Sequence, residues 1–213
     1  GSLPRTEGLI FLDIWHYTIP DIISGCRTVV GVTHAASGKR KSVKVKTKGE
    51  AHLAMEIIIA YFQSVGKPVT WIHTDNAPEL KGSEMVPLAR SKNIRITTSV
   101  VGRSRQNPQE PSWRAQSTST RKNLEQSRLP DNFWGPAWDD AEDASDLVPS
   151  RTAPHDCRLG RLLSTADKAV KPAGSYRRAF GSLCYPTMAP RLPSGTLVNK
   201  MATQSQRAIL LGY

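Results

Sequence analysis

Residues 71–80 read WIHTDNAPEL, and the interpretation of the other segments rests on them. An apolar run rich in β-branched and aromatic residues, at positions 69–72, leads into this stretch, and Pro78 ends any strand there. Asp75 is therefore expected at the carboxyl end of a strand, on the edge of a sheet. A carboxylate in that position can hold a metal ion without being buried unpaired. The alternative is an ordinary turn in which Asn follows Asp.

The chain has 213 residues and a formal net charge of +11. Its length allows one core with a smaller appendage. The surplus of basic residues favours a polyanionic partner, most often nucleic acid, over a basic protein without one. No apolar run is long enough to cross a membrane, and no glycine-rich phosphate loop indicates a small-molecule cofactor. The widely spaced Cys26, Cys157 and Cys184 are expected to be reduced thiols of an intracellular protein, without a zinc site.

The hydrophobic pattern predicts three antiparallel strands joined by short turns, at residues 9–15, 28–33 and 42–47. Alternating helices and strands follow: a helix at 50–65, a strand leading into Asp75, a helix at 82–93, a strand at 94–98, and helices at 112–127 and 132–147. The packing stripe expected in the first helix contains Leu53, Ile57, Ala60 and Tyr61, with Ile58 and Phe62 beside them. This is the ribonuclease H-like order, so the expected fold class is α/β, with a mixed five-stranded sheet flanked by helices.

The chain is expected to divide into three parts. Residues 1–4 resemble a cloning remnant, residues 5–148 are expected to form the ribonuclease H-like domain, and residues 149–213 a basic connector with a small C-terminal extension. Within the last part, residues 151–176 are expected to be loosely structured, and residues 179–186 and 207–213 to contain strands. The acidic run at 139–146 is interpreted as a solvated face or a partner for basic residues, and not as a metal site.

Three acidic residues carry the expected chemistry. In the ribonuclease H-like order the first strand lies beside the fourth, so Asp13 and the end of the strand before Asp75 become neighbours. A carboxylate in the middle of a strand, such as Asp13, is costly unless it is paired or binds a cation. The helix after the fifth strand would add Glu110. Three carboxylates on one edge could hold two Mg²⁺ or Mn²⁺ ions and support phosphodiester transfer without a covalent enzyme intermediate.

Several segments, in this order, resemble the integrase catalytic core of retroviruses and copia-type retrotransposons. LDIWH (12–16), IHTDNAPEL (72–80) and QNPQEPSWR (106–114) are similar to the blocks that hold the catalytic acids of that family, and VVGVTHAASGK (29–39) is similar to its second strand and turn. LPDNFWGPAW (129–138), FGSLCYPTMAPR (180–191) and AILLGY (208–213) resemble copia-type segments. The resemblance runs from about residue 5 to residue 213 and places the three acids at Asp13, Asp75 and Glu110.

The resemblance implies that the protein processes the 3′ ends of retroelement DNA and transfers them into target DNA, using two Mg²⁺ or Mn²⁺ ions per site. It also implies double-stranded DNA as the partner, a homodimer or higher oligomer, and action in the nucleus. Phosphate contacts with little sequence readout are expected from Arg103, Arg105, Asn107, Arg114, Arg121 and Lys122. Residues 114, 121, 122 and 128 are predicted to lie along one side of their helix.

The sequence departs from the family pattern around Glu110. Asp75 and Glu110 are 110 − 75 = 35 positions apart, one fewer than is usual in retroviral cores, and Pro108 and Pro111 replace the common glycine and arginine. Glu79 is therefore an alternative third ligand. The zinc region that usually precedes this core is absent, so partial reactions are expected. Two other functions stay open: a catalytically inactive or domesticated integrase-like module that binds DNA or dimerises, and a ribonuclease H or resolvase-type nuclease.

Overall fold

The computed structural model describes residues 6–75, 84–99, 109–150, 153–164, 179–184 and 208–211. Its centre is a five-stranded sheet in the order β3-β2-β1-β4-β5. The strands are β1 (Leu9–His16), β2 (Thr28–His34), β3 (Arg40–Val45), β4 (Trp71–Thr74) and β5 (Arg95–Thr98). The first three are antiparallel, whereas β4 is parallel to β1 and β5 is parallel to β4. The predicted mixed α/β sheet is thus confirmed.

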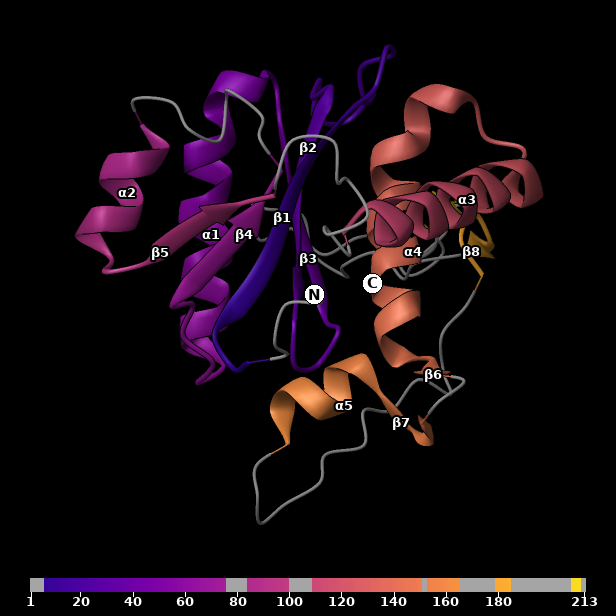
Figure 1. Cartoon of the computed structure of the whole chain (residues 1–213). Coiled ribbons are helices and arrows are strands. Elements are labelled where there is room, and N and C mark those ends of the chain that lie inside the picture. The colour runs from indigo at the N-terminus through magenta and orange to yellow at the C-terminus, as the bar shows by residue number, and fades with distance from the viewer. Residues whose placement is uncertain are drawn as a thin grey trace, which may run out of the picture.

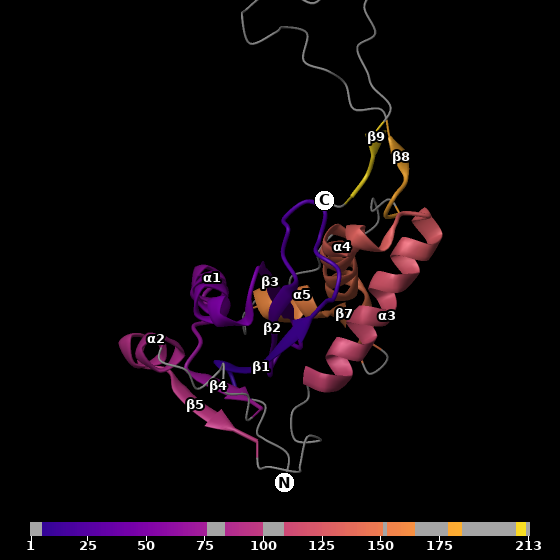
Figure 2. The same cartoon turned by 90° about the horizontal axis from the view of Figure 1, so that it is seen from above.

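Helices cover both faces of this sheet (Figure 1). On one side lie α1 (Ala51–Ser64), entered through a 3₁₀ turn (Lys48–Glu50), and α2 (Met85–Ser91). On the other side lie α3 (Gln109–Ser127) and α4 (Trp134–Leu147), the latter entered through a second 3₁₀ turn (Asp131–Phe133). Figure 2 shows the two pairs of helices separated by the sheet. In the described parts of the chain, no helix is long and apolar enough to span a membrane.

The first hydrophobic core lies between the sheet and α1. Its α1 residues are fully or nearly fully buried: Ala51, Ala54, Met55, Ile58, Ile59 and Phe62. Leu53 and Ile57 are 48% and 55% exposed, and Ala60 is also exposed, so the predicted packing stripe was wrong at these three positions. The helix carries apolar side chains around most of its circumference. Its periodicity therefore does not reveal which apolar side faces the sheet.

The second core, on the opposite face, is aromatic. Trp113 of α3 packs against Trp138 of α4, with ring centroids 5.0 Å apart, and Tyr17 stacks on Trp134 at 4.0 Å. Trp134, Trp138 and Ala141 are buried and form the packing side of this helix. These rings hold α3 and α4 together and onto the sheet.

The acidic residues of α4 face the edge strand β3. Asp146 binds Lys39 through a 2.5 Å ion pair in which both side chains are buried. Asp146 Oδ1 also accepts a hydrogen bond from the Arg40 backbone N–H at 3.4 Å, and Glu142 Oε1 accepts one from the Ser42 N–H at 3.2 Å. Carboxylates thus satisfy donors that an edge strand otherwise leaves open. The expected pairing with basic residues is confirmed, whereas a solvated face is wrong for Glu142 and Asp146.

The C-terminal part contains more regular structure than expected. Residues 153–163, predicted to be loosely structured, form β7 (Ala153–Cys157), which pairs with β6 (Pro149–Ser150), and α5 (Arg158–Leu163). Leu162 of α5 is buried in the first core, which explains why so short a helix is held in place. Two strands predicted near the end are confirmed as the antiparallel pair β8 (Leu183–Cys184) and β9 (Ala208–Ile209). Cys26 and Cys157 are free thiols.

Gly31 in β2 lets α3 approach the sheet closely. A Cβ atom at Gly31 would lie 2.7 Å from the Trp113 ring. We expect Gly31→Ala to lower the free energy of unfolding by about 1–3 kcal/mol, because the aromatic cluster has no room to adjust. Urea denaturation measures this. Gly49→Ala is the control, since its nearest atom would lie at 3.8 Å. Equal destabilisation by both changes would contradict the prediction.

Candidate active site

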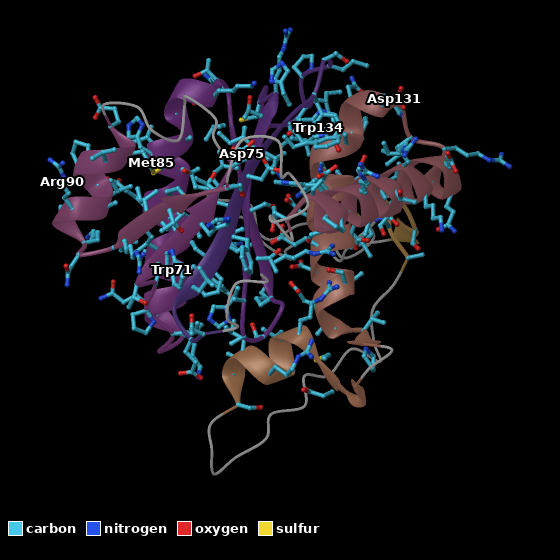
Figure 3. All side chains as sticks on the ribbon, in the orientation of Figure 1. Trp71, Asp75, Met85, Arg90, Asp131 and Trp134 are labelled. Atoms are coloured by element: carbon cyan, nitrogen blue, oxygen red, sulfur yellow. The ribbon has the colours of Figure 1, made fainter. Side chains whose placement is uncertain are left out.

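Strand pairing brings Asp13 and Asp75 to the same place. The parallel register of β1 and β4 sets Leu12 opposite Thr74, and both aspartates follow these two residues directly. Asp75 is half-buried just after the end of β4, as the sequence predicted. Figure 3 labels it in the middle of the molecule, between the helices on the two sides of the sheet. Asp13 lies inside β1, opposite Gly31 of β2.

Glu110 approaches the same point from the first turn of α3. The pKa of Asp13 is raised to about 6. Burial is the largest cause, the negative charges of Asp75 and Glu110 raise it further, and hydrogen bonds from the Ile14 N–H and from Trp113 lower it. The three predicted acids, from three separate elements, are therefore close enough for two of them to shift the pKa of the third.

The Glu110 carboxylate is paired with a basic residue of its own helix. Its Oε1 accepts a hydrogen bond from Arg114 Nη2 at 2.7 Å, in an i,i+4 pair on α3, and the side chain is 45% exposed. Among the described residues, no group of three or more His, Cys, Asp or Glu side chains is arranged to hold a metal ion. The donors themselves fit a hard divalent cation, which prefers carboxylate oxygens. Glu110 would have to leave Arg114 to complete such a set.

Only three of the predicted phosphate contacts, Arg114, Arg121 and Lys122, are described by the structure. Arg103, Arg105 and Asn107 lie outside the described residues, as does the alternative ligand Glu79. Arg121 and Lys122 are exposed on α3 but line two different hollows, and Arg128 accompanies Arg121. Lys122 therefore lies beside Arg121 rather than in line with it, and phosphate contact by these residues stays a prediction. Adjacent helix positions differ by about 100°, which separates Lys122 from Arg121.

Sequence reasoning missed Trp113. Its buried indole N–H makes no hydrogen bond of standard geometry within the described residues, yet it lies close enough to lower the pKa of Asp13. The ring packs over Gly31, the cross-strand partner of Asp13. A large aromatic residue three positions after Glu110, together with a glycine in a buried strand, was the available signal.

The raised pKa of Asp13 predicts a pH-dependent stability. The folded-state pKa of Asp13, about 6, exceeds the ordinary value of 3.8, so folding favours the protonated carboxyl. The contribution of Asp13 to the free energy of unfolding is therefore fully present below pH 3.8 and is lost as pH rises through about 6. We expect Asp13→Asn to raise the free energy of unfolding at pH 8, in EDTA, by up to about 3 kcal/mol, and by much less near pH 4. Urea titrations at both pH values test this. Glu56→Gln, at an exposed position of α1, is the control, and a gain independent of pH would contradict the assignment.

No protein-family model matches the chain. No curated protein sequence matches it either. Solved structures do. A chain of the simian T-cell lymphotropic virus intasome, in complex with a PP2A regulatory subunit, is similar at a TM-score of 0.62 and 19% identity, over 98% of this chain and 70% of that one. The HTLV-2 integrase catalytic core domain, in complex with magnesium in a trimeric form, is similar at a TM-score of 0.54 and 17% identity, over 72% of this chain and 94% of that one. The chain thus has the fold of retroviral integrase catalytic cores.

Proposed function

We propose that this chain is a polynucleotidyl transferase: the catalytic core of a copia-type integrase, which processes the 3′ ends of element DNA and transfers them into target DNA. The observation that carries the proposal is the convergence of Asp13, Asp75 and Glu110, from β1, the end of β4 and the start of α3, on one edge of the sheet. The integrase-core fold supports it.

Asp13 and Asp75 would hold Mg²⁺ or Mn²⁺, and Glu110 would join them when its pair with Arg114 opens. Bound divalent ions supply Lewis acidity, activating the attacking oxygen and stabilising the leaving one. Arg114, once released, has a free guanidinium for a DNA phosphate. Trp113 holds the start of α3 against the sheet, and thereby sets how far Glu110 can move.

The partners follow from charge and from the similar structures. A formal charge of +11 suits double-stranded DNA. One similar structure is an intasome and the other a trimeric core with magnesium, which supports DNA binding and self-association here. Arg103, Arg105 and Asn107 precede Glu110 in the chain and remain proposed phosphate contacts, and the nucleus is the proposed place of action.

One observation favours a second function. The pair between Glu110 and Arg114 and the absence, among the described residues, of a three-ligand group suit a DNA-binding module without catalysis. A core that had lost its chemistry would keep the fold, the basic surface and this pair. The catalytic function is preferred because only that function gives a reason for the destabilising, partly buried carboxylate of Asp13.

Strand transfer separates the two functions. The assay uses a labelled duplex oligonucleotide and Mg²⁺ or Mn²⁺. We expect Asp13→Asn, Asp75→Asn and Glu110→Gln each to reduce joined product by more than about 100-fold, because even the outer-shell partners of metal ligands cost 10–100-fold when removed. Asp131→Asn, in the 3₁₀ turn before α4, is the matched control and should retain activity.

The other outcomes are equally informative. If Glu110→Gln alone stays active, the third ligand lies elsewhere and Glu79→Gln is tested next. If no protein makes product while salt-sensitive DNA binding persists, the result favours the binding module or a core that needs flanking domains. Cleavage of an RNA–DNA hybrid in preference to duplex DNA would instead indicate a ribonuclease H.

A further inference from the structure

A basic cleft lies between α3, α4 and α5. Its volume is about 450 Å³, within the range of about 300–1,000 Å³ that is usual for ligand sites. Three cationic side chains from three elements line it: Arg40 of β3, Lys122 of α3 and Arg158 of α5. Their neighbours in the cleft include the hydroxyl or amide groups of Ser119, Asn123 and Gln126.

The positive charge of this cleft is only partly compensated: Asp146 and Glu142 act on Arg40, and Asp146 also acts on Arg158. No carboxylate lines it among the described residues. Arg40 Nη1 donates to the Gln116 side-chain oxygen at 2.9 Å, and Arg158 Nη1 donates to the Ser145 carbonyl at 3.3 Å, so both known partners are neutral. Burial and then the charge of Arg158 lower the pKa of Arg40 to about 10, although Asp146 and Glu142 act in the opposite direction. The charges of Arg40 and Arg158 therefore repel each other, and a bound anion would relieve that repulsion.

The cleft is separate from the candidate active site. None of Asp13, Asp75 and Glu110 lines it. Lys122 follows Glu110 by twelve positions on α3, which corresponds to about 18 Å along the helix axis. At about 3.4 Å per nucleotide, that distance equals roughly five steps of a DNA strand. A strand following α3 from the acids could therefore reach the cleft.

We infer that this cleft binds a backbone phosphate of DNA several nucleotides away from the reacting phosphodiester. Arginine, lysine, serine and amide side chains are the groups that contact DNA phosphates, and they carry no sequence information there. The inference rests on the proposed function only in taking DNA as the partner. The same chemistry would also accept free inorganic phosphate.

The test measures DNA binding without catalysis. The full chain carries Asp75→Asn and is kept in EDTA, so a failure of the catalytic proposal leaves the measurement intact. Fluorescence anisotropy with a labelled duplex, between about 50 and 200 mM salt, gives the slope of log K against log salt concentration. Lys122→Ala should reduce that slope by about 1 and weaken binding equally for unrelated sequences. Lys122 is exposed and anchors no other element, so the variant should fold.

Two further variants sharpen the result. Ser119→Lys adds a cation to the cleft and should steepen the slope. Lys92→Ala removes an exposed lysine at the end of α2, on the opposite side of the sheet, and should leave the slope unchanged. This pattern would support the inference. An equal loss for Lys92→Ala and Lys122→Ala would overturn it, because the effect would then reflect net charge alone.

A second arm distinguishes free phosphate from DNA. Thermal unfolding is recorded with and without inorganic phosphate for the wild type and for Lys122→Ala. Phosphate that stabilises only the wild type, while the DNA slopes of the two proteins agree, would overturn the DNA assignment in favour of a small anion. No effect in either arm would overturn the site altogether.

Discussion

The contact between the Trp113 ring and Gly31 sets the distance of α3 from the sheet. That helix is largely polar, and Trp113 and Leu124 are the only hydrophobic residues among its five buried ones. Its position therefore depends on a large ring meeting a strand residue without a Cβ atom. Gly31 is also the cross-strand partner of Asp13, and Glu110 precedes Trp113 by about one helical turn. A single packing contact thus places two acids from distant parts of the chain near each other.

The cost of this arrangement falls on Asp13. Its carboxylate is partly desolvated and lies near two other negative charges, and both effects destabilise the folded protein when Asp13 is ionised. The pairing of Glu110 with Arg114 moves one of those charges toward solvent and balances it. A cation near Asp13 would therefore compete with Arg114 for the carboxylate of Glu110. Such strain at one site is common where a protein has a function to perform.

The sequence predicted the sheet well because its strands have clear signals. Apolar and polar side chains alternate in β3, and Pro78, three positions after Asp75, limits how far the strand that leads into Asp75 can extend. The prediction failed where the hydrophobic pattern does not determine which face of a helix is buried or whether a short helix forms. Helix α1 has apolar residues on nearly every side, and short α5 is held by one buried leucine rather than by a periodic face. The basic cleft was invisible for another reason: Arg40 and Arg158 are far apart in the chain and meet only in the folded protein.

The pairing of charges, more than their sum, determines where a polyanion can bind. The acids of α4 neutralise Lys39 and Lys44 and bind backbone donors of the edge strand β3, whereas Arg40 of this strand lines the basic cleft. Arg158 and Lys122 form no close ion pair with a carboxylate in the described part of the chain, although the charge of Arg158 acts on Asp146. Their positive charges raise the electrostatic potential at the surface, which favours an anion such as phosphate. The acidic helix therefore offsets much of the positive charge beside β3.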